Sequence, residues 1–450
     1  MAVTLTDFPC GQSCLDGCSI RTKMIALQKT LIPEPEGGAA DVVHAFLASY
    51  RELCKESNGS VPGMTVDVAL PALFDLVMSA KYAEEMVADA GWAYCEGTGY
   101  PEGPALYFPY LRTCPRCSVH RGILPAVVSH KPGSDKIGRL ASDVNTLIMA
   151  ETIRYIAPGA RIAQSSNRTG DVDIVIYTDN LLVLAEIKSS PLAVYPLEIS
   201  LPGPLTVSRG DESVSMDDHV SATPITATAQ MSLYVPHKDM RIPLGERTDP
   251  GWPYSALETF VKGPEHVSDI ITAWKELYDV YAGRIARGPV DTRRWITCGC
   301  GSGVDDAKNA PGMDRSDDLK KGTYQVLKLG AYYKEKCLKR IIRAALISNI
   351  LALRGYERYL AEVEDILWTK AKFEVLHETE NGNADKNDAE SMAADRLESE
   401  DSQVSDTRTF RSEGIFYLFD ALLCLTRSIY RDEEIRQLTS LDAFAAELCK

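Results

Sequence analysis

The spacing of apolar residues along the chain changes between a helical and a strand-like period. Apolar positions recur every three to four residues in several long segments, which predicts amphipathic helices. These segments are 41–57, 71–90, 137–158, 264–286, 315–372, 414–427 and 432–448. Short runs of aliphatic and β-branched residues predict strands instead over 161–164 and 193–201, with a hairpin between them.

The predicted hairpin lies within the segment from Gly170 to Ser190, where charged residues interrupt an otherwise apolar pattern. Asp179-Asn180 is a turn signal between two runs of strand-forming residues. A two-residue loop at this dipeptide pairs Tyr177 with Leu182 and thereby fixes the register of both strands.

This register brings four charged side chains together. It places Asp173 opposite Glu186 and Asp171 opposite Lys188, and alternation puts Glu186 and Lys188 on one face. Burying such charges costs several kcal/mol unless something compensates. Asp173 and Glu186 offer the hard oxygen ligands that Mg²⁺ prefers, and Lys188 can orient water and stabilise negative charge. The alternative is a hairpin whose charges face solvent.

Asp173, followed after a short hairpin by Glu186-x-Lys188, resembles the core motif of the PD-(D/E)xK nuclease superfamily, which includes many type II restriction endonucleases. The resemblance implies that Asp173 and Glu186 bind magnesium and that Lys188 serves the attacking water. It also implies an additional acid from the preceding helix, which here is Glu151. Val172 stands in place of the proline that gives the motif its name.

The resemblance implies an α/β (α+β) fold with a mixed central sheet flanked by helices. The other sequence patterns predict how the rest of the chain is divided into regions. We expect a helical N-terminal region over 1–90, a small zinc-binding module over 91–121 and the nuclease core over 137–300. A helical C-terminal region follows over 315–450. It contains an acidic insert, 376–412, whose composition is typical of disorder.

The zinc prediction depends on Cys114 and Cys117, whose C-x2-C spacing lets two thiolates bind one Zn²⁺. Cys95 is the candidate third ligand, and His120, Cys54 or an N-terminal cysteine is the fourth. The alternative is a turn with two reduced thiols. Together with segment 314–330, this knuckle more loosely resembles the ApaLI-type restriction enzymes.

Double-stranded DNA is the expected partner, although a net charge of −15 disfavours phosphate contacts at first sight. The acidic residues concentrate in the insert, so basic residues elsewhere remain available. Arg116, inside the knuckle, would suit a phosphate or base contact. The preferred DNA-facing residues are Lys320, Lys321, Tyr324, Gln325 and Lys328.

Composition places the protein among ordinary globular chains, with 45% hydrophobic and 25% charged residues. The sequence has no apolar run long enough to cross a membrane and no basic start followed by an apolar segment, so we expect a cytoplasmic protein. In that compartment the 12 cysteines favour free thiols or metal ligands over disulfides.

These features favour a magnesium-dependent, sequence-specific endonuclease of double-stranded DNA. A homodimer is expected, because a palindromic site is read by two-fold symmetry. Two alternatives remain open: a zinc-containing DNA-binding protein without catalysis, and a repair or structure-specific nuclease.

Overall fold

The computed structural model describes the chain in segments. These are residues 19–32, 36–56, 63–86, 92–97, 99, 101–108, 116, 134–166, 172–204, 219–220, 228–285, 310–333, 341–353, 355–361, 367–375, 408–417 and 419–448. The chain divides into two compact units, one of Met1–Glu364 with Phe419–Lys450 and one of Asp365–Leu418.

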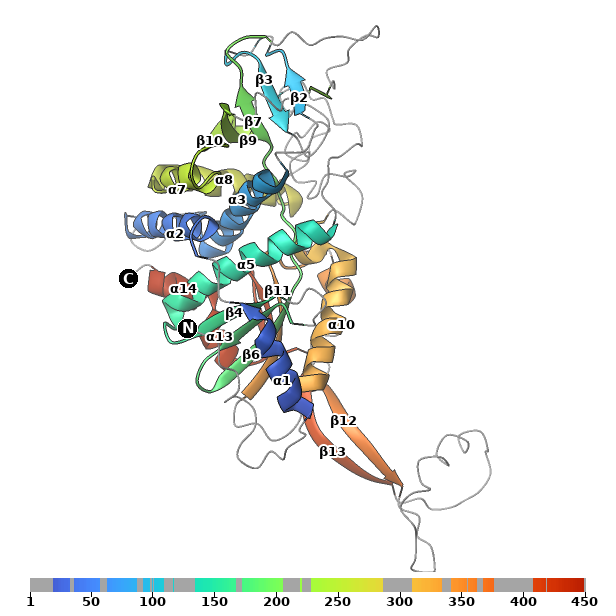
Figure 1. Cartoon of the computed structure of the whole chain (residues 1–450). Coiled ribbons are helices and arrows are strands. Elements are labelled where there is room, and N and C mark those ends of the chain that lie inside the picture. The colour runs from blue at the N-terminus through green and yellow to red at the C-terminus, as the bar shows by residue number, and fades with distance from the viewer. Residues whose placement is uncertain are drawn as a thin grey trace, which may run out of the picture. The chain divides into compact units, whose positions relative to one another are not determined.

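A seven-stranded mixed sheet in the first unit carries the predicted hairpin (Figure 1). Its strands, in spatial order, are β1 Leu31–Ile32, β4 Arg161–Ser165, β5 Ile174–Tyr177, β6 Leu181–Ile187, β11 Ile341–Ser348, β14 Ala421–Cys424 and β15 Ile429–Tyr430. The pairs β6–β11 and β11–β14 are parallel, and the other pairs are antiparallel. β6 lies in the middle of the sheet and every residue in it is buried, as expected where both faces are covered.

Helices flank this sheet, and the expected mixed central sheet with helices around it is confirmed (Figure 1). The helices are α1 Ser19–Thr30, α2 Ala39–Glu56, α3 Val66–Met86, α5 Ser134–Ile156, α7 Tyr254–Val261, α8 Pro264–Tyr281, α10 Ser316–Tyr333, α11 Tyr356–Tyr359, α13 Glu433–Thr439 and α14 Leu441–Leu448. Short 3-10 turns occur at η1 Pro236–Lys238 and η3 Gly312–Asp314. No described helix is long and apolar enough to cross a bilayer.

A second sheet in the same unit is antiparallel throughout. Its strands, in spatial order, are β10 Met240–Glu246, β9 Gln230–Val235, β7 Leu197–Ser200, β3 Ala105–Phe108, β2 Trp92–Cys95 and β8 His219–Val220. The predicted zinc-binding region, 91–121, therefore contributes two adjacent strands to this sheet.

The second unit is an antiparallel hairpin of β12 Leu367–Val375 and β13 Arg408–Tyr417. Residues 376–407, most of the predicted acidic insert, lie outside the described residues. β13 begins inside the range predicted for the insert.

Two helix predictions in the C-terminal region were wrong. Helix α10 ends at Tyr333, and the apolar run that follows forms strand β11 instead of a longer helix. Similarly, segment 414–427 contains the end of β13 and strand β14. β11 and β14 are strands buried on both faces, and such strands are largely apolar, so their sequences lack the alternation that distinguishes strand from helix. The sheet consequently extends beyond residue 300, where the predicted core ends.

Candidate active site

β5 and β6 form the predicted hairpin in the predicted register. Tyr177 lies opposite Leu182, and the pairing continues without a shift towards the other end of the strands. There the Asp173 N–H donates to the Ala185 carbonyl at 2.9 Å. Asp173 and Glu186 are therefore neighbours across the hairpin, whereas Asp171 lies outside the described residues.

The side chains of Asp173, Glu186 and Lys188 meet on one face of the hairpin. Asp173 Oδ2 accepts the Ile187 N–H at 2.7 Å, and its carboxyl group also shares a side-chain hydrogen bond with Glu186. Lys188 Nζ pairs with Glu186 Oε1. Glu186 is only 2% exposed, whereas Asp173 and Lys188 are half-buried, so the carboxyl pair and the amine lie at the edge of the protein interior.

This burial raises the pKa of Asp173 above its usual value, although the Ile187 N–H bond, the Lys188 charge and the contact with Glu186 act in the opposite direction. Two close carboxyl groups cannot both be ionised cheaply unless a cation compensates them. Lys188 supplies one positive charge, and the pair retains hard oxygen atoms suited to a divalent cation.

Helix α10 covers this face of the sheet. A Cβ atom at Gly322 would lie 3.1 Å from Lys188 Cγ and 2.8 Å from Leu346 Cδ1. The helix backbone therefore packs directly on the aliphatic stem of Lys188. Gly322 was not predicted as part of the site. The signal in the sequence was a glycine within a helical pattern, because such a glycine destabilises the helix by about 1 kcal/mol and is usually explained by close packing.

The structure does not bring Glu151 to the other predicted catalytic residues. Its Oε1 lies 2.7 Å from His44 Nε2 and also pairs with Arg154. Helix α5, which carries Glu151, packs in the core that includes Ala185. Because neighbouring residues of a strand point to opposite faces, Glu186 faces away from α5.

A buried polar network fixes the chain immediately after Lys188. Asn349, at the end of β11, donates from Nδ2 to the Ser190 carbonyl at 2.7 Å and accepts the Ser190 N–H at 3.3 Å. The Asn349 N–H donates to Ser189 Oγ at 3.1 Å, and Asn145 of α5 contacts the same hydroxyl. These residues were not predicted, because the β11 segment was assigned to a helix.

The predicted DNA-facing residues all lie on α10, but they face in different directions. Lys320, Lys321 and Lys328 are exposed, Tyr324 is 65% exposed and Gln325 is half-buried. The ammonium group of Lys320 lies 5.0 Å from the centre of the Tyr359 ring. One side of the helix is therefore engaged with a neighbouring segment.

The candidate zinc ligands are described only in part. Cys95, on β2, is buried and forms no disulfide within the described part of the chain, whereas Cys114, Cys117 and His120 lie outside the described residues. Arg116, between the two knuckle cysteines, is 1% exposed. Its predicted contact with a phosphate or base is therefore wrong, because a buried guanidinium cannot reach a DNA duplex.

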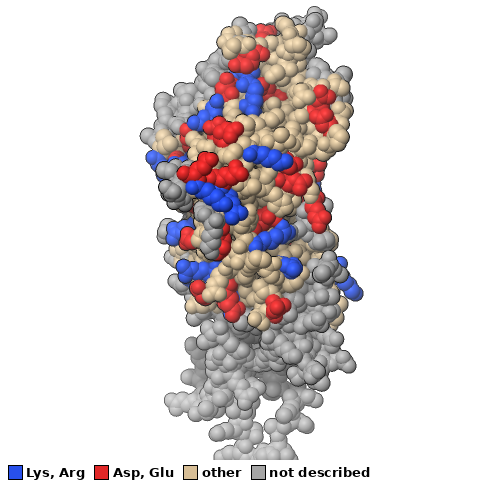
Figure 2. Space-filling view, turned by 90° about the vertical axis from the view of Figure 1, so that its left-hand side faces the viewer, with Lys and Arg blue, Asp and Glu red and all other residues tan. Residues whose placement is uncertain are grey.

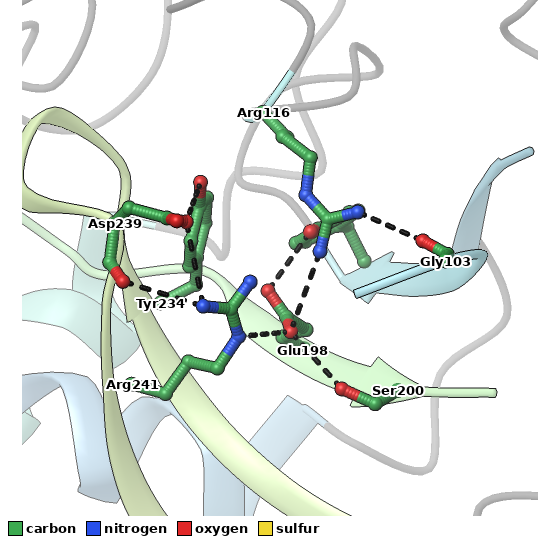
Figure 3. A network of polar contacts seen from close by, with 8 residues as sticks. Gly103, Arg116, Glu198, Ser200, Tyr234, Asp239 and Arg241 are labelled. Carbon is green, nitrogen blue, oxygen red and sulfur yellow. Dashed lines mark hydrogen bonds and ion pairs between the residues drawn. The ribbon is translucent and has the colours of Figure 1, made fainter. Parts of the chain in front are cut away.

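Arg116 instead belongs to a buried network on the antiparallel sheet (Figure 3). Its Nη1 donates to the Gly103 carbonyl at 3.0 Å, and its Nη2 lies 3.7 Å from Glu198 Oε1. Glu198 also accepts the Tyr107 hydroxyl at 2.8 Å and Arg241 Nε at 2.6 Å. This set of partners joins Arg116 to strands β3, β7 and β10.

The described residues hold no group of three or more His, Cys, Asp or Glu side chains placed to bind a metal ion. Asp173 and Glu186 form a pair, so water and substrate oxygens would have to complete a coordination shell. On the face drawn in Figure 2, basic and acidic side chains of the described residues are interspersed, without a continuous basic area.

Comparison with known proteins finds no protein family whose model matches this chain, no similar curated protein and no similar solved structure.

Proposed function

We propose that the protein is a magnesium-dependent endonuclease that hydrolyses phosphodiester bonds of double-stranded DNA. This proposal rests on one observation: the side chains of Asp173, Glu186 and Lys188 lie in contact on one face of the β5–β6 hairpin. The mixed sheet flanked by helices is the setting that the resemblance to PD-(D/E)xK nucleases implies. A centre of two carboxyl groups and an amine can compensate the charge that develops when a phosphodiester is hydrolysed.

Asp173 and Glu186 would hold the magnesium ion. Their carboxyl groups share a hydrogen bond, with Glu186 buried and Asp173 half-buried, so a divalent cation would relieve the unfavourable proximity of two acids. When bound, magnesium supplies Lewis-acid stabilisation of the phosphate oxygens.

Lys188 would orient the attacking water and stabilise negative charge on the phosphate. Its stem is held beneath α10 at Gly322 and its amine is held by Glu186. An amine fixed at both ends supplies this charge without reorganisation during the reaction.

The finer proposal is a sequence-specific type II restriction enzyme that acts as a homodimer, since a palindromic target matches two-fold symmetry. A zinc-bound module over 91–121 belongs to the same proposal. Discrete fragments from a plasmid of known sequence would support a restriction enzyme, whereas a preference for branched or damaged DNA would favour a repair nuclease.

The test is cleavage of a supercoiled plasmid with Mg²⁺ by wild-type protein and two variants. Glu186→Gln keeps the volume of the side chain, and Lys188→Met keeps the stem that packs beneath α10. Each change should lower the cleavage rate by about 10²-fold or more, as for other groups that act directly on the reacting centre.

Glu151→Gln is the matched control, because Glu151 is also a buried carboxyl group that contacts basic side chains, those of His44 and Arg154. Thermal unfolding of each variant checks that its fold is intact. Cleavage that persists in Glu186→Gln or Lys188→Met would reject the assignment. DNA binding without cleavage in any divalent metal would favour a non-catalytic DNA-binding protein.

A further inference from the structure

A cavity of about 430 Å³ lies beside the turn between strands β14 and β15. Thr426, Arg427 and Ser428 form its wall there, beyond the carboxyl end of β14, which runs parallel to β11. The first turns of α3 and α14 and one side of α2 contribute the rest of the lining. Open sheets commonly bind ligands at the carboxyl ends of parallel strands, and this volume is in the range of sites for small organic molecules.

Much of the lining of this cavity is apolar. Tyr50 and Cys54 of α2 are buried, and the lining continues over Met64, Leu441 and Ala445. A tyrosine ring offers apolar surface and also attracts cations to its face. The cavity can therefore accommodate the apolar body of a ligand.

Two hydroxyl groups at the cavity wall use their protons within the protein. Tyr430 donates its hydroxyl proton to the Thr439 carbonyl at 2.9 Å, and Ser428 donates to the Cys424 carbonyl at 3.2 Å. A hydroxyl group has one proton and two lone pairs, so in this arrangement both side chains can only accept a hydrogen bond from a ligand. The wall consequently favours a ligand that donates hydrogen bonds.

Two carboxylates make the charge of the cavity lining negative. Asp67 and Asp442 are exposed residues in the first turns of α3 and α14. Neither carboxylate forms an ion pair or a hydrogen bond with another residue in the described part of the chain. Arg427 is the single basic residue among the described residues that line the cavity, so one of the two negative charges is left without compensation. Both carboxylates therefore remain available to a cationic ligand.

We propose that this cavity binds a small organic cation, a primary amine with a compact apolar body. The ammonium group binds at the carboxylates of Asp67 and Asp442, while the body packs against Tyr50 and its apolar neighbours. An ammonium ion supplies three hydrogen-bond donors and one positive charge, which complements an acceptor-rich wall of negative charge. An anion of the same size would face two carboxylates. The inference goes beyond the proposed nuclease function and is independent of it, because none of the three residues that carry that proposal lines the cavity.

The test is isothermal titration calorimetry of the full chain at pH 7 with three ligands that carry the same phenyl ring and differ in charge. Phenethylamine is a cation at this pH, phenethyl alcohol is neutral and hydrocinnamate is an anion. The amine should bind with a dissociation constant of about 1 mM or lower, which a ligand of this size can reach. The alcohol should bind at least about tenfold more weakly, because hydrogen bonds between charged groups are the stronger ones. Hydrocinnamate should not bind.

Three variants locate the bound amine. Asp442→Asn should lower the affinity for phenethylamine about tenfold, and Ala445→Leu should lower it by at least as much, because the larger side chain narrows the cavity. Asp41→Asn is the matched control and should leave the affinity unchanged, because Asp41 is an exposed acid in the first turn of α2 that does not line the cavity. Thermal unfolding checks that each variant is folded.

Wild-type protein that does not bind the amine, or that binds hydrocinnamate or the alcohol as tightly, would overturn the proposal. An unchanged affinity in Asp442→Asn, or an equal loss in Asp41→Asn, would do the same. Plasmid cleavage is measured separately, so a failure of the nuclease proposal leaves the result of this titration intact.

Discussion

Asp75 of helix α3 allows a quantitative test of the contacts that hold the chain after the β5–β6 hairpin. Its side chain has no solvent exposure and accepts the N–H groups of Leu192 at 3.2 Å and Ala193 at 2.8 Å. Oδ2 also accepts Trp274 Nε1 at 2.7 Å. Burial raises the pKa of Asp75 from 3.8 to about 8, against the opposing effect of these three donors.

A carboxyl group whose pKa is raised on folding stabilises the protein at low pH, and this contribution is lost as the pH rises through the folded value. With pKa values of 3.8 unfolded and about 8 folded, the contribution of Asp75 should fall by about 3 kcal/mol between pH 6 and pH 9. Most of the loss should occur below pH 8.

Asp75→Asn removes the titration and conserves volume, so the difference between wild type and variant isolates this group from all others. Equilibrium unfolding in urea at pH 6, 7, 8 and 9 measures that difference. The free energy of unfolding of wild type, relative to Asp75→Asn, should decline with pH and level off near pH 9. A difference that stays constant or grows with pH would show an ionised Asp75, and would refute the argument that burial outweighs the donors.

Two further predictions concern the candidate active site and the predicted zinc-binding module. Gly322→Ala should change the free energy of unfolding only modestly, because a cost of about 1–3 kcal/mol from overpacking is partly offset by a gain of about 1 kcal/mol in helix propensity. The same change should slow plasmid cleavage at least tenfold, because the added methyl group displaces Lys188. An unchanged cleavage rate would contradict this prediction. Purified protein should contain about one zinc ion per chain when measured by plasma emission spectroscopy, and the Cys114→Ser variant should lack this zinc. Wild-type protein that is free of zinc after preparation without chelators would contradict the prediction.

The hairpin could be predicted from sequence because its determinants are local. The Asp179-Asn180 turn fixed the pairing of Tyr177 with Leu182, and strand alternation then placed Glu186 and Lys188 together. The partner strand β11 could not be recognised in the same way, because a strand buried on both faces shows no alternation of apolar and polar residues.

The predicted catalytic acid Glu151 illustrates a second limit of prediction from sequence. Glu151 was chosen by its position before the hairpin, but sequence distance does not tell which face of the sheet a helix covers. The structure places α5 against the face of Ala185 and α10 against the face of Lys188. The contacts that complete the site, at Gly322 and Asn349, therefore come from segments more than a hundred residues downstream of the hairpin.

The parallel pairing of β6 with β11 has a consequence for biosynthesis. The bonds between Ser190 and Asn349 span 159 residues of chain, so this half of the sheet has high contact order and forms late. Until β11 emerges from the ribosome, a nascent chain presents β6 as an open, apolar edge. Chaperones that shield such edges should therefore govern the yield of mature protein.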